Sequence, residues 1–272
     1  MDIREYDFDR PAAARHFWEQ AKLAFVLAML APELPNATRL LDPGCGDAFI
    51  GRELCRTGFR GQYLGIDPAM TEEHAAALRR AFPETVTADF APSLESLPDA
   101  PPADLVIMLD LLEHIENEDD FLTELFQRTA PGAPVLVTVP AFPGLYTEHD
   151  RVLGHFRRYR RKPLAALLNR NGFEVIADGY FFFSLLPVRW LEKTVGKFVR
   201  SSRRGAALLP PPERYGIFNR FFAAWLRCDL WFGAAARRIG IQLPGLSCFA
   251  LCRRSTPAAE RRNSSSTAPS PI

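Results

Sequence analysis

The sequence predicts an α/β fold with a mostly parallel sheet of seven strands and helices on both faces. Strand-like and helix-like segments alternate from residue 38 to residue 140, which indicates parallel strands joined by right-handed crossovers. Apolar residues dominate the segments 104–109 and 134–139, as expected of strands that helices cover on both faces. A chain of 272 residues with 47% hydrophobic content is also long enough for one full-size core.

The elements are expected at short intervals along the chain. Apolar residues at helical spacing predict a first helix over 11–31, which Pro32 and Pro35 close. A polar loop is expected after the strand at 134–139, and a final strand over 245–254. The other strands are expected at 38–42, 62–67, 85–89, 104–109 and 173–181, and the other helices at 48–56, 71–81, 119–129 and 163–171.

We expect one domain over residues 1–254, because no linker-like segment divides the chain before that point. Its core spans 38–181, and an aromatic and basic insertion of two or three helices, 182–244, precedes the last strand. Residues 255–272 have the Ser, Pro and Ala bias of a disordered tail.

The net charge of +1 hides an uneven distribution. Residues 1–150 hold 11 Lys and Arg against 26 Asp and Glu, whereas residues 151–254 hold 20 against 5. This split predicts either a basic face that meets an anionic partner or two halves that neutralise each other at their interface.

Five cysteines without a CxxC pair argue against a disulfide framework or a zinc site. The N-terminal residues lack a signal sequence, and no run of 18 apolar residues is free of charges. We therefore expect a cytoplasmic protein, peripheral at most at the inner face of a membrane.

A glycine-rich turn, LLDPGCGDAFIG at 40–51, follows the first predicted strand. In an open parallel sheet the ligand lies beyond the carboxyl ends of the strands. Gly44 and Gly46 let the backbone approach a ligand, and Asp67 ends the second strand, where a carboxylate can accept both ribose hydroxyls. Phe49 occupies the position where a dinucleotide fingerprint has its third glycine, and no P-loop lysine is present.

Here the sequence resembles the class I SAM-dependent methyltransferases, through LLDPGCGDAF, LGID at 64–67, ADF at 88–90 and DLVIMLDLLEHIENED at 104–119. The resemblance implies a Rossmann-like fold and binding of S-adenosyl-L-methionine (SAM), with S-adenosyl-L-homocysteine as product. Asp89 and Phe90 would then offer an acceptor and a ring edge to the base. The residues expected to bind the cofactor are Asp42, Gly44, Cys45, Gly46, Asp47, Asp67, Pro68, Asp89, Phe90 and Leu109.

Two further segments resemble a bacterial subgroup of this family. HFWEQAK at 16–22 is similar to its H-F-W-F-x-x-R opening, from which Glu19 and Lys22 depart. HDRVLGHFRRYRRKPLAALLNRNGF at 149–173 is similar to its H-D-x-x-L-G-H-x-R-R-Y segment.

D-x-x-E-H at residues 110–114 lies where the methyl group should emerge. His114 is a candidate base for a protonated acceptor. E-x-x-E-H binds a divalent metal in quinone-pathway and small-RNA O-methyltransferases, so Asp110, Glu113 and His114 are the set that would hold Mg²⁺. The same residues also have a structural role at the start of a helix in this superfamily, and we expect no metal.

The acceptor is expected against the loop that follows the fifth strand. His149, His155 and Tyr159 are, with His114, the candidate catalytic residues, because histidines can take up protons near neutral pH. Paired arginines can bind a carboxylate or phosphate, and the alternative is that they pair with acids of the N-terminal half. The candidate acceptor-binding residues are Tyr146, Asp150, Arg157 and Arg158.

The insertion is dense in Phe and Trp, with Arg and Lys at helical intervals over 182–238. This composition is typical of a helix in an anionic membrane interface, and equally of a lid, a dimer contact or core packing. Nucleic-acid binding is a weak alternative because the N-terminal half is acidic.

The sequence predicts a SAM-dependent methyltransferase that acts on a small-molecule or lipid-linked acceptor, at oxygen. The alternatives are an RNA or protein methyltransferase and a catalytically weak SAM-binding interaction module.

Overall fold

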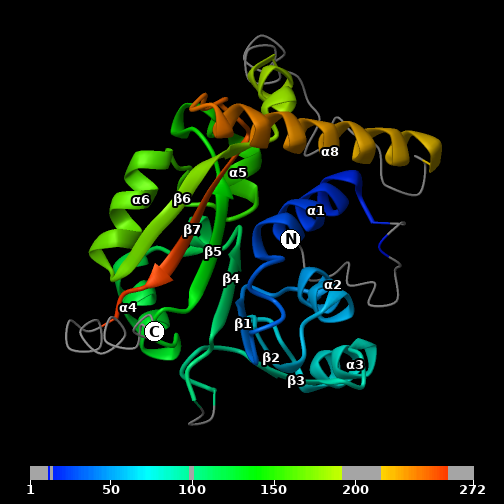
Figure 1. Cartoon of the computed structure of the whole chain (residues 1–272), viewed down its shortest axis with the longest axis vertical. Helices are drawn as coiled ribbons and strands as arrows, with labels where there is room; N and C mark the ends of the chain where they lie inside the picture. The colour runs from blue at the N-terminus through cyan, green and yellow to red at the C-terminus, as the bar shows by residue number, and fades with distance from the viewer. Residues whose placement is uncertain (1–11, 13–14, 98–100, 192–215, 257–272) are drawn as a thin grey trace, which may run out of the picture.

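The computed structural model describes residues 12, 15–97, 101–191 and 216–256. Its centre is a seven-stranded sheet in the order β3-β2-β1-β4-β5-β7-β6 (Figure 1). Strands β1 to β5 are parallel, and β7 lies antiparallel between β5 and β6. The predicted α/β fold with its mostly parallel sheet is confirmed. The strands are β1 (Arg39–Pro43), β2 (Gly61–Ile66), β3 (Val86–Ala91), β4 (Leu105–Leu109), β5 (Pro134–Pro140), β6 (Phe173–Phe181) and β7 (Ser247–Arg254).

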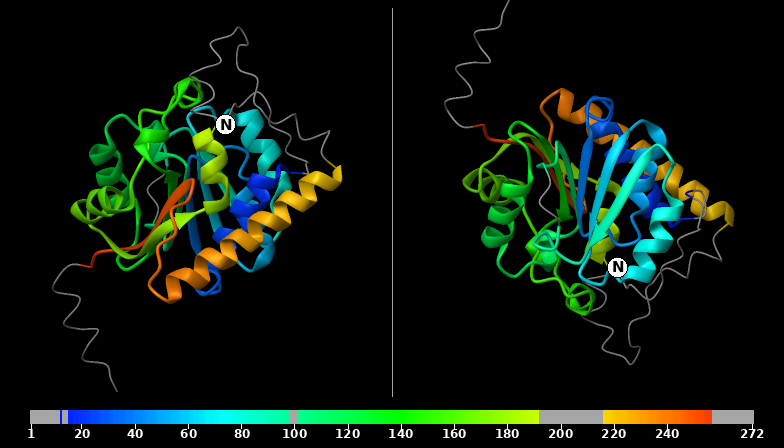
Figure 2. Two further views of the ribbon diagram at one scale, coloured as in Figure 1. Left: turned by 90° about the horizontal axis from the view of Figure 1, so that it is seen from above. Right: turned by 90° about the horizontal axis from the view of Figure 1, so that it is seen from below.

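Helices cover both faces of the sheet (Figure 2). One buried cluster joins the sheet to α1, α2, α3 and α8, and a second cluster joins the opposite face to α4 and α6. The site is therefore confined to the edge where the strands end. The helices are α1 (Phe17–Leu30), α2 (Phe49–Thr57), α3 (Glu72–Ala81), α4 (Glu118–Arg128), α5 (Glu148–Val152), α6 (Arg161–Arg170) and α8 (Gly216–Arg238).

The first helix begins at Phe17 rather than near residue 11, so the predicted start at 11 was wrong for the residues that are described. His16 caps it: its Nδ1 accepts the N–H of Trp18 at 3.3 Å, and its own N–H donates to Glu19 Oε2 at 3.1 Å. These two bonds satisfy backbone donors that a helix start leaves open. Part of the motif at 16–22 is thus a helix cap.

Strand β3 extends to Ala91, two residues beyond its predicted end. Asp89 pairs with Leu64, Phe90 with Gly65 and Ala91 with Ile66. Asp89 consequently lies within the strand and not at its tip.

The loop after β5 contains a short helix, α5, which the sequence did not predict. The Asp150 side chain accepts the N–H of Thr147 at 2.8 Å and so fixes the helix start. The loop leads into α6, which begins at Arg161, two residues before the predicted start at 163.

The insertion places helical segments at both of its ends. A 3-10 turn, η5 (Phe183–Leu185), continues into helical residues 186–191, and α8 lies on α1. None of the helices in the described ranges is long and apolar enough to cross a bilayer. The middle of the insertion, 192–215, and the predicted tail beyond residue 256 lie outside the described residues.

Candidate functional site

Strained backbone marks the edge of the sheet where the parallel strands end. Among the described residues other than glycine, Ala48, Asp110, Phe142 and Phe182 have a positive φ. Ala48 lies in the turn after β1, and the others follow β4, β5 and β6 within two residues. Such conformations persist where the surrounding structure enforces them, and they gather at functional sites.

The glycine turn is shaped as a cradle. Gly44 has φ +76°, its N–H donates to the Ile66 carbonyl at 2.7 Å, and a Cβ on it would come within 3.0 Å of Leu111 Cδ1. Gly46 has φ +54°, and its N–H donates to Asp67 Oδ2 at 3.1 Å. The turn and the tip of β2 therefore form one rigid unit. Its positive φ angles favour glycine, and a backbone turn without side chains fits SAM.

Asp67 is held at the tip of β2 with its carboxylate half-buried. The other oxygen, Oδ1, accepts the N–H of Ala69 at 3.0 Å, and exposed Pro68 turns the chain between them. Each oxygen keeps a second lone pair, so the carboxylate can still accept ribose hydroxyls.

Asp42 lies beneath the turn and is buried. Its Oδ2 accepts the hydroxyl of Tyr63 at 2.6 Å, and burial raises its pKa to about 7. Half-buried Cys45 lies above it, beside Gly65, where burial raises the pKa of its thiol. Both residues support the cradle from inside.

The segment just before α1 contributes a residue that the sequence did not predict. Arg15 forms a buried ion pair with Asp47, and its guanidinium lies 4.7 Å from the centre of the Phe49 ring. Asp47 also accepts the N–H of Phe49 at 3.2 Å. Asp47, a predicted cofactor contact, thus accepts the first N–H of α2 and ties Arg15 to the turn after β1.

The structure separates the two residues expected to meet the base. The Asp89 carboxylate accepts Gln62 Nε2 at 2.9 Å and lines a small hollow with Arg39 and Arg128, away from Asp67. Phe90 lies on the other face, beside Gly65. Contact between Asp89 and a base remains a prediction.

Asp110 directly follows Leu109 at the end of β4, and both of its carboxylate oxygens bind other groups of the protein. Lys22 of α1 forms an ion pair with it, and Thr138 Oγ1 donates to its Oδ1 at 2.9 Å. Burial acts to raise the pKa of Asp110, but the Lys22 ammonium and the Thr138 hydroxyl, with a smaller effect of His155, together hold the pKa below its usual range. Lys22 occupies the place of the arginine in the resembled opening motif.

Glu113, His114 and His155 form a compact group with ligand atoms within 4.8 Å of one another. Asp110, which the sequence placed in the possible metal set, is not in it. The His114 and His155 rings meet edge to face with centroids 4.6 Å apart. Glu113 is buried, and its Oε2 has no hydrogen-bond partner among the described residues. One carboxylate oxygen and two imidazole nitrogens form a donor set that fits a divalent cation.

Burial controls the charge of this group. It lowers the pKa of His114 to about 4, with His155 adding to the effect, so this imidazole is neutral near pH 7. Burial, followed by the charge of Asp110, raises the pKa of Glu113 well above its usual range. The neutral imidazole can accept a proton.

Asp150 is the buried centre of the loop after β5. One oxygen accepts Arg158 Nε at 2.8 Å and lies 3.3 Å from His155 Nδ1, and the other lies 3.3 Å from Arg189 Nη2. Burial opposes its ionisation, but His155 and Arg158 more than compensate, so its pKa is well below the usual range. Asp150 therefore positions His155, whose carbonyl also accepts the Tyr146 hydroxyl at 2.6 Å.

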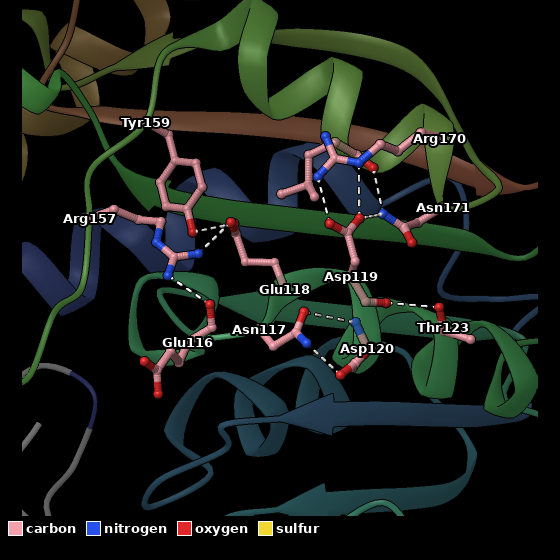
Figure 3. A network of polar contacts seen from close by, with 11 residues as sticks. Glu116, Asn117, Glu118, Asp119, Asp120, Thr123, Arg157, Tyr159, Arg170 and Asn171 are labelled. Atoms are coloured by element: carbon pink, nitrogen blue, oxygen red, sulfur yellow. Dashed lines mark hydrogen bonds and ion pairs between the residues drawn. The ribbon is translucent and has the colours of Figure 1, made fainter.

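Arg157 and Tyr159 lie in a second network, on the α4 side (Figure 3). Arg157 forms an ion pair with Glu118 and donates to the Glu116 carbonyl at 2.8 Å, and the Tyr159 hydroxyl donates to Glu118 at 2.7 Å. Burial raises the pKa of Tyr159, so it is a poor candidate base. His149 is exposed, outside the group of Glu113, His114 and His155.

An open hollow of about 310 Å³ adjoins this network. Four arginines line it, Arg157, Arg158, Arg160 and Arg170, together with Glu118. Three of these arginines already bind carboxylates of residues 1–150. This agrees with the alternative prediction that the acidic and basic halves of the chain neutralise each other.

With this geometry in place, comparisons identify the family. Residues 14–178 match the family model described as "Methyltransferase domain". A ubiquinone biosynthesis O-methyltransferase of Rhodopseudomonas palustris is 28% identical over 130 residues, 48% of this chain and 47% of that protein. One of Rickettsia bellii is 31% identical over 102 residues, 37% and 41% of the two chains. The chain thus spans about half the length of the curated relatives it matches, or less.

A crystal structure of an S-adenosylmethionine-dependent methyltransferase from Mesorhizobium loti has a TM-score of 0.51 at 17% identity, covering 86% of this chain and 98% of the other. This likeness supports the fold. Together with the family match, it shows that the chain contains a class I SAM-dependent methyltransferase domain and belongs to the methyltransferase-domain family.

Proposed function

We propose that the protein transfers a methyl group from SAM to a hydroxyl oxygen of a small, lipid-like acceptor. The observation that carries the proposal is the group of Glu113, His114 and His155 at the end of β4, beside the glycine cradle. The curated relatives named O-methyltransferases support oxygen as the acceptor atom.

Gly44, Gly46 and Asp67 would hold the cofactor. When bound, SAM supplies an electrophilic methyl group. Methyl transfer is an in-line displacement, so a rigid cradle contributes by fixing the position from which the acceptor must approach. The Lys22–Asp110 ion pair joins α1 to the end of β4 beside this cradle.

A hydroxyl must lose its proton during the transfer, and His114 is a neutral imidazole beside the expected methyl position. His155 lies edge-on to it and is oriented by Asp150. If a divalent cation binds instead, Glu113, His114 and His155 would hold it, and it would lower the pKa of the hydroxyl. The open hollow that arginines line near Glu118 supports the expectation that Arg157 and Arg158 bind an anionic group on the acceptor.

The test is transfer of a labelled methyl group to matched acceptors. We would compare prenylated and unprenylated phenols with amines, thiols, RNA and protein extract. Label on phenolic oxygen, with a preference for the prenylated compound, is the expected result. Label on RNA or protein, or binding of SAM without turnover on any acceptor, would contradict the proposal.

A variant pair ties the activity to the site. His114→Asn should lower kcat by about 100-fold while leaving the SAM Kd within about twofold, because a positioned base contributes 10²–10⁴-fold. His74→Asn, on α3, is the matched control and should leave both quantities unchanged. Equal loss in both variants would remove His114 from the mechanism.

Chelation separates the two roles of the histidine group. Activity that survives exhaustive dialysis against EDTA assigns proton acceptance to the histidines. Activity that is lost and then restored by Mg²⁺ or Mn²⁺ assigns them to a cation, with a calorimetric binding isotherm as the second readout.

A further inference from the structure

Helix α8 carries a second apolar face that the fold does not bury. Asn219, Ala223 and Leu226 face the core, whereas Phe218, Phe221 and Trp225 are 65%, 57% and 52% exposed. Their spacing of three, four and seven residues places these aromatics on one side of the helix. Phe232, 56% exposed, continues the same side. We call Phe218, Phe221, Trp225 and Phe232 the aromatic face.

The exposed charges of α8 are all positive. Arg220, Arg227 and Arg238 are exposed. Its sole acid, Asp229, is buried and accepts the N–H groups of Phe183 and Ser184 at 2.9 and 3.0 Å. A helix with exposed aromatics on one side and arginines beside them suits the boundary between lipid headgroups and acyl chains.

The insertion joins the aromatic face to the active site. Trp225 Nε1 donates to Ser184 Oγ at 3.0 Å, which ties α8 to the turn that leads into 186–191. That short helix exposes Val188, at 54%, and sends Arg189 to Thr147 Oγ1 at 2.8 Å and to Asp150. In Figure 1, α8 and residues 186–191 lie together beyond α1, at the end of the molecule near α5.

We propose that α8 and residues 186–191 dock the protein on an anionic lipid surface, with the aromatic face inserted among the headgroups and the arginines paired with lipid phosphates. Residues 186–191 then link the docked surface to the acceptor loop through the contact of Arg189 with Asp150. The docking itself is independent of the proposed function. Only the delivery of a lipid-like acceptor from the bilayer rests on the proposed function.

Charge favours lipid over two other occupants. A second copy that docked its own α8 against this helix would bring its arginines toward Arg220 and Arg227 and supply no exposed acid of α8 in exchange. Residues 192–215 of this chain contain six Lys and Arg against two Glu, so they would repel the same arginines. Anionic headgroups neutralise both sets of cations.

The test is co-sedimentation of the full chain with vesicles of phosphatidylcholine, with and without phosphatidylglycerol. We expect binding only to the anionic vesicles, and loss of most of it in high salt. Phe218→Ser with Phe221→Ser should lower the partition coefficient at least about tenfold. Arg220→Glu with Arg227→Glu should do so by a similar factor.

Ile176→Ser, on β6, is the matched control, because Ile176 is 51% exposed on a different element. It should bind vesicles like the unaltered protein, and circular dichroism should show that all variants are folded.

Three results would overturn the proposal: equal binding by the control and the aromatic-face variant, a dimer that Phe218→Ser with Phe221→Ser converts to monomers, or a monomer that binds no vesicle. The dimer assigns the face to a second copy, and the non-binding monomer shows that the face does not bind lipid. None of these measurements uses the methyl acceptor, so their failure leaves the proposed chemistry untouched.

Discussion

The cofactor cradle and the acceptor loop lie at the same edge of the sheet but are built in different ways. The cradle consists of backbone turns at neighbouring strand tips, such as the bond from Gly46 N–H to Asp67. The acceptor side consists of charged side chains brought together from distant segments, such as Lys22 with Asp110 and Arg189 with Asp150. Rigid backbone suits a ligand that never changes, whereas paired side chains can be replaced to fit another acceptor.

The largest effect is expected on the free energy of unfolding, when the buried side-chain network of the acceptor loop loses its central carboxylate. Asp150→Ala should lower the free energy of unfolding by about 3–5 kcal/mol, because it leaves the buried Arg158 without its carboxylate partner. Urea denaturation measures the loss. Asp119→Ala removes an exposed pair with Arg170 and should change stability far less. A similar loss in both variants would show that Asp150 is not the buried centre of the acceptor loop.

The cradle should instead make the stability of the protein depend on pH. Burial raises the pKa of Asp42 from the usual 3.8 to about 7 in the folded protein, so the folded state binds the proton more tightly than the unfolded state does. Stability contributed by protonated Asp42 is therefore lost as pH rises from about 4 to about 7.

Asp42→Asn removes this loss, so the variant should gain on the order of 3 kcal/mol relative to the unaltered protein between pH 4 and pH 8. Unfolding curves across that range test it. A difference that does not vary with pH would mean that Asp42 ionises normally.

Cofactor affinity is the next smaller effect. Gly44→Ala should raise the SAM Kd at least about tenfold, because a Cβ there approaches Leu111 and distorts the cradle. Gly132→Ala is the matched control: its φ is +75° and nothing lies within 4 Å of the added atom. Calorimetry should find the same SAM Kd for Gly132→Ala as for the unaltered protein, even though both substitutions strain the backbone.

The smallest effect is expected at the rim of the acceptor side. Arg157→Ala should raise the acceptor KM by about three- to tenfold and spare SAM affinity, because its charge lines the open hollow and not the cradle. Steady-state kinetics with both substrates varied measures this. A change in SAM affinity with the acceptor KM unaltered would place Arg157 on the cofactor side.

Sequence reasoning worked where function depends on local backbone. The glycines, the acid at the tip of β2 and six of the seven strand ends, to within one residue, follow from short-range spacing. The seventh, β3, failed because pairing with β2 continued through Asp89 to Ala91. The side chain of Asp89 then faced Gln62, and hydrophobic pattern alone does not fix such a pairing length.

The sequence by itself determined the sheet, the glycine cradle and the residue types of the acceptor loop, because periodicity and turn chemistry act over a few residues. Only the tertiary structure decided which of those residues meet. In the tertiary structure His155, not Asp110, lies beside Glu113 and His114, and Asp110 pairs with Lys22. Several aromatic residues of α8 lie outside the core. Pairs 39 and 88 residues apart, such as Arg157–Glu118 and Lys22–Asp110, depend on how helices pack on the sheet, and no local pattern encodes that.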